Sequence, residues 1–184
     1  MKVLAAIAVA LLIGVGAALT WLWAPWDEGG GDSVELDALA EEFRGSGCRR
    51  LAGIAADLAE ADPEPSRFLR ALGREAAGIR PPPRAFTDLA RGGSDRIPGR
   101  GFLARFDDGS LGQARHFAGI AVARSFGSAA DVRRISIDLR RDPADSPDGR
   151  LTDEAIEFAN AVLGGDLSVA ETPEWMLDNL CRRR

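Results

Sequence analysis

Two hydrophobic patterns divide the chain. From Val3 to Trp26 no residue is charged, and about 20 apolar residues are enough to span the hydrocarbon core of a bilayer. After the polar stretch 27–33, apolar residues recur every three or four positions, which is typical of amphipathic helices around a core. The patterns predict a signal-anchor or transmembrane helix at 1–26, a linker at 27–33, an α-helical domain at 34–181 and a basic tail at 182–184.

The periodic part predicts an all-α fold, a compact orthogonal bundle of six or seven helices. Apolar faces with helical spacing, separated by glycine or proline, occur at 36–43, 51–61, 68–79, 111–126, 132–139, 156–163 and 175–180. Ser128 is predicted to cap the helix over 132–139, with Val132, Ile135 and Leu139 facing inward. Thr152 is predicted to cap the next helix, after a turn-rich loop at 142–149. The stretch 134–139 alternates briefly like a strand, but its context favours helix.

Residues 84–110 show no sustained periodicity. This segment is rich in Gly, Arg and Asp, and a loop this long in a compact domain is usually functional or disordered. We expect an irregular segment held by scattered apolar side chains, with one short helix at 85–91. Its arginines at 84, 91, 96, 100 and 105 form either an anion-binding rim or ion pairs with nearby aspartates, and the second interpretation is favoured.

The charges around the apolar N-terminal run predict its orientation. Lys2 and the terminal amine precede the run, whereas Asp27, Glu28 and Asp32 follow it. The positive-inside rule then places the N-terminus in the cytoplasm and the domain outside the cell membrane, anchored through residues 3–26. The alternative is a cleaved signal peptide and secretion. Cleavage near Gly16-Ala17-Ala18 would leave a hydrophobic new terminus, so we prefer the uncleaved anchor.

Composition narrows the function classes. The formal net charge is −5, and this mild acidity argues against a nucleic-acid partner, which normally meets a basic face. Tyrosine is absent, which excludes a tyrosine nucleophile. All basic residues except Lys2 and one histidine are arginines; together with the leader, this bias suggests a bacterial protein.

The chain has two cysteines, Cys48 and Cys181. An even count in a domain expected outside the cytoplasm favours a disulfide between them, although two separate thiols stay possible. Two cysteines and one histidine fall short of the four ligands of a usual structural zinc site, and no C-x-x-C spacing occurs. The stretch "GRGFLARF" lacks the ending of a phosphate-binding loop. We therefore predict neither a metal nor a cofactor.

The single histidine, His116, lies near the start of the apolar helix in "GQARHFAGIAVARSFG" at 112–127. It is either a neutral core residue or a general acid or base that lines a cleft beside the 84–110 segment. The catalytic interpretation requires a carboxylate partner, for which the candidates are Asp138, Asp153, Glu154 and Glu157. No serine lies in a G-x-S-x-G context, and the core interpretation is favoured.

Residues 107–168 carry a resemblance. "GQARHFAGIAVARSFGSAAD" and the later "DEAIEFANAVLGGDL" resemble bacterial helical domains in which a Q-x-R-H-F start opens a small-residue helix and an N-x-x-x-G segment follows. These domains have no established activity. The residues in the matching places are Gln113, Arg115, His116, Phe117, Asn160 and Gly164. The resemblance implies a shared fold and a polar cluster of Gln113, Arg115, His116 and Asn160.

These observations lead to one expected function and two alternatives. We expect a membrane-anchored envelope protein with a non-enzymatic binding or scaffolding domain, whose partner is an envelope protein or cell-wall material. The first alternative is a small envelope hydrolase that uses His116 with a carboxylate. The second is a toxin-like or immunity-like module.

Overall fold

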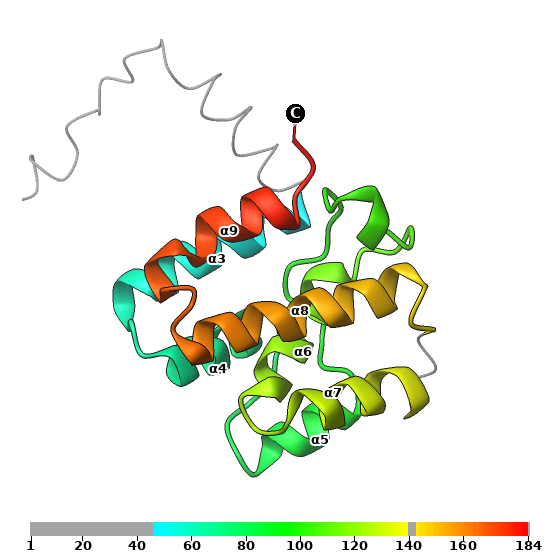
Figure 1. Ribbon diagram of the computed structural model, residues 1–184, viewed down its shortest axis with the longest axis horizontal. Helices are drawn as coiled ribbons and strands as arrows, with labels where there is room; N and C mark the ends of the chain where they lie inside the picture. Colours follow the sequence, from blue (N-terminus) through cyan, green and yellow to red (C-terminus); the bar gives the residue numbers. More distant parts are fainter. Residues whose placement is uncertain (1–45, 140–142, 184) are drawn as a thin grey trace, which may run out of the picture. The chain divides into compact units, whose positions relative to one another are not determined.

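The protein is described by a computed structural model that covers residues 46–139 and 143–183, with the side chains of 138 and 139 excluded. Within these residues the fold is an all-α domain of seven α-helices, as predicted (Figure 1). The α-helices are α3 (Gly47–Ala61), α4 (Pro65–Ala77), α5 (Arg84–Ala90), α6 (Gln113–Arg124), α7 (Ala129–Arg134), α8 (Pro147–Gly164) and α9 (Thr172–Asn179). Two 3-10 turns, Ala104–Phe106 and Val169–Glu171, and one π-helical turn, Ile135–Leu139, complete the regular structure of this part.

The N-terminal predictions lie outside the described residues. These are the membrane-spanning helix at 1–26, the linker at 27–33 and the helix over 36–43. Among the helices that the structure describes, none is both long and apolar enough to cross a membrane.

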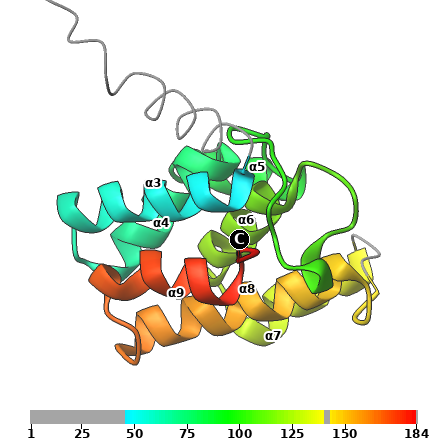
Figure 2. The same cartoon turned by 90° about the horizontal axis from the view of Figure 1, so that it is seen from above.

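Helix α6 forms the centre of the bundle, packed between α4 and α8 (Figures 1 and 2). Its sequence explains this position, because residues 117–123 are uncharged on every side and mostly small, and a helix that is apolar all round is a buried one. Phe117, Ala118 and Ala121 are completely buried. Close packing against α4 depends on Gly73, since a Cβ atom there would lie only 2.6 Å from the Cβ of Val122.

Four of the described helices begin at side-chain caps that their sequences encode; the caps are Ser46 for α3, Glu64 for α4, the predicted Ser128 for α7 and Ser146 for α8. The carboxylate of Glu64 accepts hydrogen bonds from the backbone N–H groups of Ser66 and Arg67 at the start of α4. At the start of α8, Ser146 Oγ accepts from the backbone of Gly149 (3.0 Å), and Pro147 occupies the first turn. The predicted cap at Thr152 is therefore wrong. The helix begins five residues earlier, inside the predicted 142–149 loop, and Thr152 lies buried within it.

The irregular segment is held as predicted. The expected short helix is α5, and the chain from 91 to 112 then contains only one 3-10 turn. Ile97, Phe102 and Phe106 are buried. These side chains secure a polar, glycine-rich stretch to the core.

The predicted inner face of the helix after Ser128 is correct for Val132 and wrong for Ile135. Val132 is buried, but Ile135 is 52% exposed and the neighbouring Ser136 is 1% exposed. The change coincides with the switch from α7 to the π-helical turn at Ile135. Ser136 lies four residues after Val132, so the two side chains fall on the same face of the helix, whereas Ile135 lies at the edge of that face.

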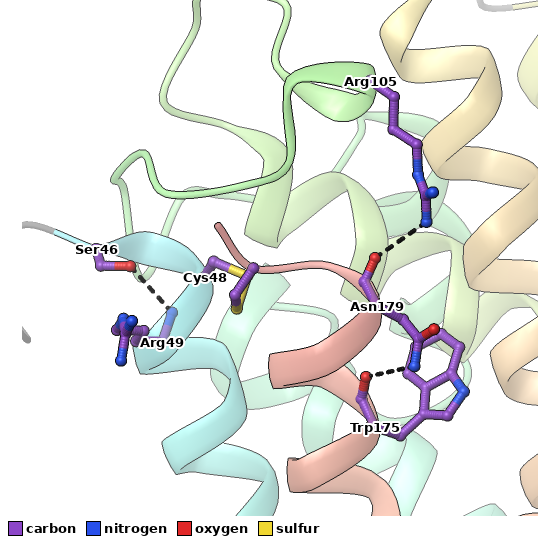
Figure 3. Close-up of a disulfide and its surroundings, with 7 residues drawn as sticks. Ser46, Cys48, Arg49, Arg105, Trp175 and Asn179 are labelled. Carbon is purple, nitrogen blue, oxygen red and sulfur yellow. Dashed lines mark hydrogen bonds between the residues drawn. A yellow bond between two sulfur atoms is a disulfide. The ribbon is translucent and has the colours of Figure 1, made fainter. Parts of the chain in front are cut away.

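The predicted disulfide is present between Cys48 at the start of α3 and Cys181 just after α9 (Figure 3). Both cysteines are buried, and α3 and α9 pack side by side. The irregular segment joins the same region, because Leu103 N donates to Leu180 O and Arg182 N donates to Gly101 O, both at 2.8 Å. The end of the chain is thereby tied to the first described helix.

Candidate functional site

An apolar pocket lies between α5, α6 and α7. Its volume is about 410 Å³, within the usual range for small-molecule sites. The irregular segment and the turn after α7 complete its wall. Its principal apolar lining residues are Ile79, Phe86, Leu89, Ile120, Phe126 and Val132.

Large apolar side chains remain exposed where this pocket meets solvent. Phe86 is 61% exposed and Ile135 is 52% exposed, and both line the pocket. The Phe86 ring also contacts that of Phe126, with centroids 6.0 Å apart. Exposed apolar side chains at the edge of an apolar pocket are typical of an interaction site.

A chain of three hydrogen-bonded side chains underlies the pocket. Nε2 of His116 lies 2.8 Å from Oγ1 of Thr152, and that oxygen lies 2.9 Å from Oγ of Ser136. All three residues are buried. They come from α6, α8 and the π-turn, so only tertiary packing brings them together. His116 and Ser136 line the pocket, whereas Thr152 lies behind them.

The donor and acceptor roles of the three side chains are coupled. Thr152 has a single hydroxyl proton, so it donates to one neighbour and accepts from the other. If His116 Nε2 accepts from Thr152, then Ser136 donates to Thr152. If Nε2–H donates instead, Thr152 donates to Ser136. The tautomer of the imidazole and the orientation of the Ser136 hydroxyl at the pocket are therefore coupled.

Arg115 contributes a fixed cation to the same pocket. Its Nε lies 2.8 Å from Oδ1 of Asp95, and its Nη1 donates to the carbonyl of Gly92 at 3.0 Å. These contacts attach the irregular segment to α6. Asp131 of α7 also lines the pocket, which thus carries charge of both signs along with its apolar wall.

The four residues of the predicted polar cluster have separate partners. Gln113 bonds to Asp108 and Ser110, and Asn160 Oδ1 accepts from Arg124 Nε at 2.7 Å. Neither lines the pocket; of the four, only Arg115 and His116 do. Gln113 lies in the first turn of α6, whereas the partner of Asn160 lies in its last turn, so the two ends of one helix separate them.

Two of the four predicted carboxylate partners of His116 pair with arginines. Asp153 lies 2.7 Å from Arg133, and Glu154 lies 3.5 Å from Arg105. Burial raises the pKa of Glu154, and the charge of Arg105 opposes this rise. Glu157 is exposed, and the side chain of Asp138 is outside the described residues.

Sequence reasoning missed Thr152 and Ser136. Thr152 could have been found, because "SPDG" at 146–149 is a typical helix start, and starting the helix there places Thr152 on its buried side. Ser136 had a weaker signal. It lies four residues after Val132, and side chains four apart share a helix face, but the apolar Ile135, three residues after Val132, was assigned to the inner face instead.

No protein-family model, curated protein or solved structure matches the chain. The resemblance over residues 107–168 therefore stays a prediction. The geometry of the pocket and the buried polar chain is the basis for a functional assignment.

Proposed function

We propose that the chain is a non-enzymatic binding protein of the bacterial envelope, and that its helical domain binds a small, largely apolar ligand in the pocket between α5, α6 and α7. The observation that carries this proposal is the combination of an apolar cavity of about 410 Å³ with two convergent polar groups, His116 and Ser136. Pockets of this composition are the usual form of small-molecule sites.

The lining indicates the chemistry of the ligand. Aliphatic and aromatic side chains favour an apolar body, which gains free energy as it leaves water. The Ser136 hydroxyl and the His116 ring favour one hydroxyl, carbonyl or amide group on that body. Arg115 is already paired with Asp95, so it supplies less attraction for a strongly anionic ligand.

The location is proposed on two grounds. The uncharged run from Val3 to Trp26 favours a signal-anchor in the cell membrane, with secretion after cleavage as the alternative. The Cys48–Cys181 disulfide is of a kind that persists mainly in oxidising compartments. Both favour a domain outside the cytoplasm, where envelope or cell-wall components are available as ligands or partners.

The geometry gives less support to the hydrolase alternative. That alternative uses His116 with a carboxylate, and two of the candidate carboxylates, Asp153 and Glu154, are paired with Arg133 and Arg105. A catalytic serine, for its part, is usually bonded directly to the histidine that takes its proton. Here Thr152 stands between Ser136 and His116, and Thr152 is completely buried. The arrangement suits a fixed polar wall better than an activated nucleophile.

The substitution Gly119→Leu tests the proposed pocket. Gly119 lines the pocket, and a Cβ atom there would meet nothing within 4 Å, so leucine fills the cavity without displacing packed atoms. We expect the full chain in neutral detergent to bind 2-naphthol saturably, as measured from the amide chemical shifts of residues 119, 120 and 136. Affinity in Gly119→Leu should fall at least tenfold.

The matched control is Gly53→Leu. Gly53 also has open space around its Cβ position, but it lies in α3 and does not line the pocket. Its affinity for 2-naphthol should equal that of the parent chain. The proposal is wrong if 2-naphthol does not bind saturably, or if Gly119→Leu binds as tightly as Gly53→Leu.

A further inference from the structure

A second cavity, of about 300 Å³, has a different chemistry from the apolar pocket. The two cavities share no lining residue, although their residues alternate along the same segments. Arg91 and Gly93 line the second cavity, whereas Gly92 between them lines the apolar pocket. The second cavity is lined by Gly78, Arg80, Asp88, Arg91, Gly93, Ser94 and Arg96.

One arginine of this cavity is bound to its single carboxylate. Asp88 accepts from the backbone N of Arg80 (3.0 Å) and from Nε (2.9 Å) and Nη2 (2.7 Å) of its side chain. These hydrogen bonds lower the pKa of Asp88 to about 2. Asp88 is nearly buried, and its oxygens are already directed at Arg80, so this pair forms a rigid wall.

The other two arginines have no such partner. Neither Arg91 nor Arg96 forms an ion pair in the part of the chain that the structure describes, and both are exposed. Three arginines and one aspartate leave an excess of positive charge in a chain whose formal net charge is −5. An excess of positive charge at one cavity attracts an anion.

A glycine allows two polar groups to approach each other in this cavity. Gly78 ends α4 with a φ of +65°, and a Cβ atom there would lie 2.1 Å from Ser94 Oγ and 3.3 Å from Arg96 Nε. The hydroxyl and the guanidinium thus converge on the space above Gly78 that a side chain would otherwise fill.

We propose that this cavity is an oxyanion site that binds a phosphate group through Arg91, Arg96 and the Ser94 hydroxyl, with the Arg80–Asp88 pair as its fixed wall. The planar guanidinium group matches the geometry of phosphate oxygens and can donate two parallel hydrogen bonds. The same chemistry fits a free phosphate or the headgroup of an acidic phospholipid. This site is independent of the apolar pocket and of the function proposed for it.

Arginine side-chain NMR tests the proposal on the full chain in neutral detergent. One titration uses inorganic phosphate against sodium chloride at equal ionic strength. The other uses dihexanoyl phosphatidylglycerol against dihexanoyl phosphatidylcholine. We expect saturable shifts of the Nε–Hε resonances of Arg91 and Arg96 with phosphate or with phosphatidylglycerol. The more effective of the two identifies a free anion or a lipid headgroup as the source.

Charge-matched variants separate a specific site from general attraction. The double variant Arg91→Gln with Arg96→Gln should lose at least tenfold in affinity, measured in all variants from the backbone amide shifts of Gly78, Gly93 and Ser94, which line the cavity. The control is Arg134→Gln with Arg183→Gln, which removes the same charge at exposed positions outside the cavity, and it should bind as the parent does. The proposal fails if neither phosphate nor phosphatidylglycerol gives saturable shifts, or if both double variants lose affinity equally. Circular dichroism verifies that each variant is folded.

Discussion

At the scale of single residues, Thr152 links the buried hydrogen-bonded side chains of His116 and Ser136. Its hydroxyl contacts both His116 and Ser136, so one oxygen serves two buried partners. A buried polar group that loses its hydrogen bond keeps the cost of leaving water without the compensating interaction. Thr152 is therefore expected to matter more for stability than its size suggests.

The substitution Thr152→Val tests this expectation, because it retains shape and removes the hydroxyl. We expect a loss of about 1–3 kcal/mol in the free energy of unfolding, measured by urea denaturation. Thr87→Val is the control, since the Thr87 hydroxyl is exposed and bonds to the Arg84 carbonyl. Equal losses of unfolding free energy in the two variants would show that the buried hydrogen bonds of Thr152 stabilise the domain no more than the exposed hydrogen bond of Thr87.

Asp88 should make the domain sensitive to acid in a defined range. Its pKa is about 2 in the folded chain, compared with an ordinary value of 3.8, chiefly because of hydrogen bonds from Arg80. As the pH falls from about 4 to about 2, the unfolded chain takes up this proton and the folded chain does not, so stability falls. Above about pH 4, the full stabilising contribution of the Asp88 carboxylate is present.

In Asp88→Asn, the fall in stability between pH 4 and pH 2 should be smaller than in the parent chain. Urea midpoints at pH 4, 3 and 2 measure it. Some acid sensitivity should remain, because hydrogen bonds also lower the pKa values of Glu64 and Glu171. If the urea midpoint of Asp88→Asn falls between pH 4 and pH 2 as steeply as that of the parent chain, Asp88 does not cause this acid sensitivity.

At the scale of elements, contact between α4 and α6 depends on a glycine. Gly→Ala inside a helix normally stabilises it by about 0.5–1 kcal/mol. At Gly73 the added methyl group would meet three Val122 side-chain atoms at 2.6–2.9 Å, and such overpacking typically costs about 1–3 kcal/mol. Gly73→Ala should therefore destabilise the domain.

Gly53→Ala provides the matched comparison for Gly73→Ala. Gly53 lies inside α3, and a Cβ atom there would meet nothing within 4 Å. We expect Gly53→Ala to raise the thermal midpoint and Gly73→Ala to lower it. Shifts of the same sign would mean that helix propensity, and not the α4–α6 contact, governs both positions.

The predictability of each element followed from how local its signal was. The cap at Ser128 was predicted correctly, because a capping side chain bonds to the backbone of its own first turn. The start of α8 was misplaced because Thr152 and Ser146 are both acceptable caps by residue type. The inward position of Ser136 was missed, because Ile135 and Ser136 lie three and four residues after Val132, both fit helical spacing, and the apolar residue was assigned to the inner face.

At the scale of the whole molecule, the disulfide closes nearly the entire described chain. Cys48 and Cys181 are 133 residues apart in sequence, and in the chain-entropy model a loop of this length stabilises by about 5 kcal/mol. We expect Cys48→Ala with Cys181→Ala to lose several kcal/mol in urea denaturation. A reducing agent should destabilise the parent chain and leave the double variant unchanged. A loss below about 1 kcal/mol would contradict the loop-closure argument.

The candidate site was only partly predictable. His116 and Arg115 were identified from the sequence and do line one pocket, but Gln113 and Asn160 have other partners. Gln113, Arg115 and His116 lie within one turn of α6, and Asn160 lies on α8. The resemblance grouped these residues by their place in a motif, whereas the direction of each side chain decides which of them lines the pocket. The missing members, Thr152 and Ser136, come from elements that the sequence places 36 and 20 positions away from His116.

The sequence by itself determined the all-α class, the uncharged helix after Gly112 and the irregular segment, and it favoured a disulfide between the two cysteines. These features depend on hydrophobic periodicity, residue composition and the number of cysteines, all of which are visible in the sequence without the tertiary structure. Tertiary structure alone decided which polar groups meet at His116, which arginines stay unpaired and where the cavities lie. These depend on side-chain direction across packed helices, which the sequence pattern alone does not fix.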